Sequence, residues 1–176
     1  MTPYRVLVVE DDPMFAEYVR SILEEQCGVG KFHCQLAKTL TQAAGYLASS
    51  VGTYDLCLLD LKINGDCGPS TLRYMLNVRD DIPFVVMTGS GSDEVEQECM
   101  DMGAQDFIRK ESIKGDRESI LKLVKDLEKS IRRHNARRVA KALMAPVKAM
   151  VADAMSKPPH QQESVKASDT TVIERK

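Results

Sequence analysis

Short apolar runs alternate with helix-like segments through the first 111 residues. Four runs are nearly continuous and one is weak, and apolar residues between them recur three or four positions apart, as in amphipathic helices. The runs lie at residues 5–9, 33–37 (the weak one), 56–59, 84–87 and 107–108. Continuous apolar strands separated by helices predict an α/β fold of five strand–helix units, with a parallel sheet covered on both faces.

Particular residues mark where the helices begin and end. Asp12-Pro13 supplies an N-cap and a proline at the first helical position. Gly68-Pro69 opens the third helix, and Gly103 closes the fourth. The fifth helix is expected to begin near Lys114.

The last helical pattern is longer than the others, because its apolar residues continue at steps of three, four or eight as far as Ala154. Pro146 lies within it and is expected to kink the helix or to start a new one. We expect an α/β domain over residues 1–133 that includes the fifth helix, a helical extension over 134–156, and a disordered polar tail over 157–176.

Charge is distributed unevenly along the chain. Residues 1–111 contain 18 acidic and 9 basic residues, residues 112–157 contain 5 and 12, and residues 158–176 contain 3 of each. The basic segment includes Arg132, Arg133, Arg137, Arg138 and Lys141. Such a stretch can bind nucleic acid, but it is more often a solvated helix face. No glycine follows Gly115, which disfavours a helix-turn-helix.

Apolar residues continue beside the basic stretch. Leu143, Val147 and Met150 recur at helical spacing beyond the predicted domain. A stripe of this kind favours binding to a partner protein or to a second copy of the chain.

Composition limits the class of protein and its location. Hydrophobic residues make up 43% of the chain, which excludes a fully disordered chain. No apolar run is long enough to span a membrane, and the first residues do not form a secretory signal. The five cysteines contain no C-x-x-C pair, so we expect free thiols and a cytoplasmic location.

Acidic side chains follow two of the predicted strands. Glu10 and Asp11 come after the first strand, and Asp60 comes after the third. Ligands of open parallel sheets bind outside the carboxyl ends of the strands, so these carboxylates converge if the two strands are neighbours. Crowded carboxylates need a compensating cation, and hard oxygen ligands at an open cleft suit Mg²⁺.

Two further residues end the remaining strands. Thr88 follows the fourth apolar run and Lys110 follows the fifth. A nucleophilic carboxylate, a metal site and a cation are the groups that phosphoryl transfer requires. Each residue alone has an ordinary explanation as a turn, a cap or a surface charge. Their occurrence at successive strand ends favours phosphoryl-transfer chemistry.

Four segments, at residues 6–13, 55–60 with Gly68, 82–89 and 103–110, resemble the CheY-like receiver domain of two-component response regulators. They lie within about the first two-thirds of the chain. The resemblance implies a flavodoxin-like, doubly wound five-stranded parallel sheet of strand order 2-1-3-4-5, here with an extended C-terminal helix.

The resemblance also implies roles for individual residues. Asp60 is expected to accept the phosphoryl group, and Lys110 and Thr88 to contact it. Thr88 and Phe107 are expected to form the switch, with the aromatic ring moving inward as the threonine moves.

A metal site is implied at the same place. Asp11, Asp60 and the backbone carbonyl of Lys62 are expected to bind Mg²⁺ directly, and Glu10 through a metal-bound water.

Three positions depart from the family pattern. Glu111 follows the lysine where the family has a proline in a cis peptide, so this loop is open to a trans form. Ile63-Asn64 replaces a common Met-Pro. Lys62 occupies a position that tunes dephosphorylation in the family, and the direction of its effect stays open.

The function implied is a phosphorylation-switched signalling module. It would take its phosphoryl group from a sensor histidine kinase or a histidine phosphotransfer protein and signal by binding a downstream protein. We do not expect an enzyme; the module would at most remove its own phosphoryl group slowly. The less favoured alternative is a transcriptional regulator that binds DNA through the basic segment. The main interpretation expects neither a nucleic acid nor a membrane as a partner.

Two other classes are less favoured. A phosphate-independent scaffold would not need the intact acidic set. A dehalogenase-type phosphatase needs a second aspartate two residues after its nucleophile, where this chain has Lys62.

Overall fold

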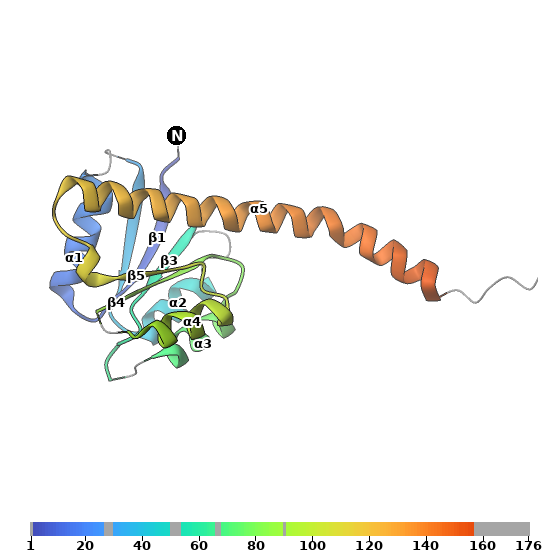
Figure 1. The fold of residues 1–176 in the computed structure, drawn as a ribbon, viewed down its shortest axis with the longest axis horizontal. Coiled ribbons are helices and arrows are strands. Elements are labelled where there is room, and N and C mark those ends of the chain that lie inside the picture. Colours follow the sequence, from blue (N-terminus) through green and yellow to red (C-terminus); the bar gives the residue numbers. More distant parts are fainter. Residues whose placement is uncertain (1, 27–29, 50–53, 66–67, 90, 157–176) are drawn as a thin grey trace, which may run out of the picture. The chain divides into compact units, whose positions relative to one another are not determined.

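A five-stranded parallel sheet lies at the centre of the fold (Figure 1). The computed structural model describes residues 2–26, 30–49, 54–65, 68–89 and 91–156. The strand order is β2-β1-β3-β4-β5, which confirms the expected doubly wound topology. The strands are β1 (Tyr4–Val9), β2 (Phe32–Ala37), β3 (Leu56–Leu59), β4 (Phe84–Thr88) and β5 (Asp106–Arg109).

Helices cover both faces of this sheet. One buried apolar cluster joins the sheet to α1, η1 and the first part of α5, and a second joins it to α2, α3 and α4 (Figure 1). The helical elements are α1 (Pro13–Ser21), the π-helix η1 (Ile22–Gln26), α2 (Leu40–Ser49), α3 (Pro69–Val78), α4 (Asp93–Met102), the 3₁₀ turn η2 (Lys110–Ser112) and α5 (Arg117–Ser156). The near-continuous apolar strands are explained by this double cover.

The helix ends follow the sequence signals. Asp12 caps α1 by accepting hydrogen bonds from the backbone N–H groups of Met14 (2.9 Å) and Phe15 (3.3 Å). Gly68 precedes Pro69 at the start of α3. Gly103 ends α4 at a φ of 112°, a left-handed conformation that favours glycine.

The helix α5 differs in two details from the sequence expectation. It begins at Arg117 rather than near Lys114, and Asp116 accepts a hydrogen bond from the N–H of Ser119 in its first turn (2.9 Å). It continues through Pro146 to Ser156 as one helix, so of the two effects expected of the proline, a kink or a new helix, the structure excludes the new helix. A helix can carry an internal proline at the loss of one backbone hydrogen bond.

Contacts divide the chain into two units, and the boundary lies between Arg138 and Val139. In the first unit, α5 buries a row of apolar residues: Ile120, Leu123, Val124, Leu127 and Ile131. In the second, the apolar side chains described are exposed: Val139, Leu143, Met144, Val147 and Met150. The tail expected over 157–176 lies outside the described residues. Among the helices described, none combines the length and apolar character needed to cross a bilayer.

Candidate functional site

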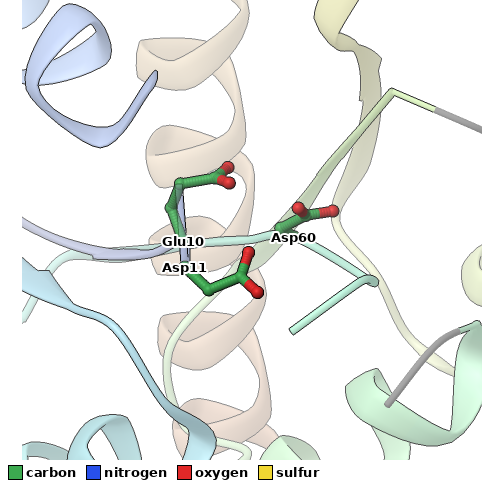
Figure 2. Close-up of side chains that lie close together, drawn as sticks. All are labelled: Glu10, Asp11 and Asp60. Atoms are coloured by element: carbon green, nitrogen blue, oxygen red, sulfur yellow. The ribbon is translucent and has the colours of Figure 1, made fainter. Parts of the chain in front are cut away.

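Strand register brings the acidic residues together. Val9 of β1 pairs with Leu59 of β3, so the residues that follow, Glu10 and Asp60, leave the sheet side by side. Figure 2 shows Glu10 and Asp11 at the end of β1 with Asp60 beside them. One carboxylate oxygen from each of these three residues lies within 4.8 Å of the other two. Glu10 is 1% exposed and Asp60 is 4% exposed, so water screens these two charges poorly.

Lys110 neutralises part of this charge. Its Nζ atom lies 2.6 Å from Oε2 of Glu10 and 2.7 Å from Oδ2 of Asp60. The same atom lies 4.6 Å from the centroid of the Phe15 ring, within cation–π range. The ammonium therefore bridges two strands of the sheet at the point where the carboxylates meet.

Burial and ion pairing act in opposite directions on the pKa values of Glu10 and Lys110. Burial raises the pKa of Glu10 above its ordinary value, and this outweighs the lowering by Lys110. Burial alone would lower the pKa of Lys110, but its hydrogen bonds and attraction to Asp60 and Glu10 raise it overall. The lysine is thus held in its charged form.

Backbone groups of the loop after β3 orient the other carboxylate oxygens. The N–H of Lys62 donates to Oδ1 of Asp60 (3.1 Å), and the N–H of Asn64 donates to Oδ2 of Asp11 (2.8 Å). Asn64 has a φ of 51°, and its Nδ2 donates to the carbonyl of Lys38 (2.9 Å). Sequence reasoning missed this support, although Asn64-Gly65 is a typical turn pair in which asparagine tolerates the left-handed region.

Thr88 is the last residue of β4, and Phe107 is the second residue of the neighbouring strand β5. Thr88 is buried and Phe107 is partly buried. A Cβ atom at Gly91 would lie 3.1 Å from Cζ of Phe107 and 3.4 Å from Cγ2 of Thr88, so both side chains flank this glycine. A Cβ at Gly89 would lie 3.7 Å from Cδ of Lys110, which brings the end of β4 against the lysine stem.

The structure brings together most of the site that the sequence predicts. Glu10, Asp11, Asp60 and Lys110 meet directly, while the side chain of Lys62 is exposed. The peptide bond between Lys110 and Glu111 is trans, the form left open by the missing proline.

The donor set fits a divalent cation. Three carboxylates face a single ammonium, so negative charge remains at the site. Carboxylate oxygens are the ligands that Mg²⁺ prefers, and a partly exposed Asp11 leaves room for the waters that Mg²⁺ retains.

Residues 6–125 match the model of the response regulator receiver domain family. The chain belongs to this family. This receiver is also similar to the response regulator protein PilR of Pseudomonas aeruginosa, with 27% identity over 110 residues that cover 62% of this chain and 23% of PilR. The transcriptional regulatory protein AruR of the same organism is 32% identical over 110 residues, which cover 60% of this chain and 43% of AruR. The receiver spans less than half the length of these curated relatives.

Solved structures agree on the fold. A CheY-like receiver domain protein from Methanospirillum hungatei JF-1 has a TM-score of 0.62 and 19% identity, and the match covers 77% of this chain and 98% of that one. The non-phosphorylated HemR receiver domain of Leptospira biflexa has a TM-score of 0.56 and 26% identity, over 73% and 94% of the two chains. The receiver fold therefore accounts for the first unit of this protein.

Proposed function

We propose that this receiver accepts a phosphoryl group on Asp60 from a sensor histidine kinase or a histidine phosphotransfer protein. The observation that carries this proposal is the buried Asp60 carboxylate, ion-paired to Lys110 at 2.7 Å and flanked by Glu10 and Asp11. In the transfer, a carboxylate oxygen of Asp60 forms a bond to phosphorus while the bond from phosphorus to the donor's histidine nitrogen breaks.

The surrounding residues would stabilise the charge that the transfer adds. Lys110 already lies on the carboxylate and would also pair with the phosphoryl oxygens. Glu10, Asp11, Asp60 and the carbonyl of Lys62 would hold Mg²⁺, which when bound neutralises negative charge on the phosphoryl oxygens.

The readout we propose is a rearrangement at Thr88 and Phe107 that changes protein binding. Both side chains border Gly91, where a Cβ atom would crowd the Phe107 ring and so restrict its movement. Self-dephosphorylation is expected to be slow, and we propose no other enzymatic activity. The position of Lys62, two residues after Asp60, makes it the residue whose substitution should alter that rate.

The output we propose is protein binding through the exposed apolar row of α5. Val139, Leu143 and Val147 lie one helical turn apart and are all exposed. A downstream protein or a second copy of this chain would cover them. Light scattering tests the second copy. A mass that stays at the monomer value at every protein concentration, with and without phosphorylation, would exclude dimerisation through this row.

DNA binding is the competing output, since AruR is named a transcriptional regulatory protein. The receiver covers only 43% of AruR, so its output does not carry over. Duplex binding that weakens steeply with salt would favour the DNA-binding alternative.

We further propose a cytoplasmic location. Two of the described cysteines, Cys57 and Cys99, are buried free thiols, as in proteins of reducing compartments. Burial raises the pKa of Cys99 to about 11, so this thiol stays protonated and unreactive at neutral pH.

The proposal is tested by intact-protein mass after incubation with acetyl phosphate and Mg²⁺. We expect the wild type to gain the mass of one phosphoryl group, and Asp60→Asn and an EDTA-treated wild type to gain none. An adduct of equal yield in Asp60→Asn, or no adduct in the wild type at any time, would contradict it.

A further inference from the structure

Arg109 connects the end of β5 to the loop that leads into α4. It is the last residue of β5, pairs with Thr88 of β4 in the sheet, and directly precedes Lys110. Its Nη1 donates to the carbonyl of Gly91. Its Nη2 lies 2.8 Å from Oδ1 of Asp93 and 3.2 Å from Oε2 of Glu96. One guanidinium therefore holds a backbone carbonyl and two acids of the first turn of α4.

The same guanidinium packs over the predicted switch aromatic. Cζ of Arg109 lies 5.8 Å from the centroid of the Phe107 ring, within cation–π range. The edge of that ring borders Gly91, whose carbonyl accepts the hydrogen bond from Arg109. Arg109, Phe107 and Gly91 thus form one cluster beside Thr88.

The cluster constrains Gly91 and Phe107, which would have to move if Thr88 and Phe107 rearrange. A planar guanidinium fork binds several acceptors only in a fixed relative arrangement, and hydrogen bonds from a charged donor are stronger than neutral ones. A displacement of Gly91 from β5 would break the bond to its carbonyl, and a displacement of Phe107 would remove the ring from beneath the guanidinium.

We infer that Arg109 is a positioning residue that holds Gly91, the start of α4 and Phe107 in the arrangement of the unphosphorylated protein, and so opposes the switch. This inference rests on the proposed function, because it assumes that phosphorylation of Asp60 moves Thr88 and Phe107. Arg109 does not touch the phosphoryl site. It acts through the positions of Gly91, the first turn of α4 and Phe107.

Exposure ranks the interactions of the guanidinium. The side chain of Arg109 is 40% exposed and that of Asp93 is 97% exposed, so the Asp93 pair is well screened by water. The bond to the Gly91 carbonyl, the packing on Phe107 and the less exposed Glu96 pair therefore contribute more than the Asp93 pair. Removing the guanidinium should have a clear effect, and removing the Asp93 charge a small one.

The test is the affinity of the full chain for beryllofluoride, a phosphoryl mimic, measured by calorimetric titration in the presence of Mg²⁺. We expect Arg109→Ala to bind beryllofluoride about fivefold more tightly than the wild type, because the competing arrangement has lost its stabilising contacts. Arg109→Lys keeps the charge without the fork and should fall between the two. Asp93→Asn should stay within about twofold of the wild type.

Arg20→Ala serves as a matched control, because Arg20 is a partly exposed arginine paired with Glu17 within α1, and its removal should leave the affinity unchanged. Damage to the fold does not explain a gain in affinity. An affinity of Arg109→Ala equal to or weaker than that of the wild type, with an unchanged urea midpoint, would overturn the inference alone. A wild type that neither binds beryllofluoride nor gains a phosphoryl group would overturn the proposed function and this inference together.

Discussion

The two parts of α5 have the same helical spacing of apolar residues and opposite exposure. Before Arg138, the row that includes Leu127 packs against β1, β3 and β4 in one buried cluster, and Leu127 is 0% exposed. After Val139, the corresponding row is exposed, and Leu143 is 69% exposed. Spacing alone therefore predicts a helix face, and only a sheet or another partner decides whether that face is buried.

Charge separates the two parts as well. The chain has no acidic residue between Glu128 and Asp153, and seven basic residues lie in that interval. Two such helices packed along each other would bring like charges together without acids to pair with them. The comparison therefore favours an acidic partner surface over direct pairing of two α5 extensions.

Truncation of one leucine in each part of α5 should separate the two parts most clearly. Leu127→Ala should lower the free energy of unfolding by about 2–5 kcal/mol, because it opens a cavity in the buried cluster. Leu143→Ala should change it by less than about 0.5 kcal/mol. Urea unfolding followed by circular dichroism measures both, and equal losses would remove the distinction between the two parts of the helix.

The features that could be predicted from the sequence depend on strand order or on local signals such as helix caps. Glu10 and Asp60 were predicted to converge because both follow strands that become neighbours, and Asp12 was predicted as a cap from its place before a proline. The contacts that support the site could not be predicted from the sequence, because the paths of loops bring together partners that lie far apart along the chain. The hydrogen bond from Asn64 to Asp11 spans 53 positions, and that from Arg109 to Gly91 spans 18.

A smaller effect is expected for the ion pairs of α5. Lys31, before β2, lies 2.9 Å from Glu128, whereas Lys122 and Asp126 form a looser pair at 3.8 Å within the helix. A double-mutant cycle should give a coupling of up to about 1 kcal/mol for the first pair and about 0.3 kcal/mol or less for the second. The reverse order would mean that the Lys31–Glu128 pair does not help to hold α5 in place.

The smallest effect expected is on the pH dependence of stability. The hydrogen bond and charge of Arg79 hold the pKa of Asp81 below its ordinary value of 3.8. The folded state therefore gains stability from the ionised carboxylate above that value and loses it as pH falls through the lowered pKa. The side chain is about half exposed, so the loss is modest. Urea midpoints between about pH 5 and about pH 3 should fall less steeply in Asp81→Asn than in the wild type, and identical slopes would contradict this assignment.

Phosphorylation is proposed to occur in the first part of the chain, at Asp60. The most direct measurement is to treat the acetyl phosphate-reacted protein with borohydride, which reduces an aspartyl phosphate to homoserine, and to map the change by peptide mass spectrometry. We predict that the modification lies at Asp60 alone. Modification of Glu10 or Asp11 in place of Asp60, or of none of the three, would show that Asp60 is not the phosphoryl acceptor.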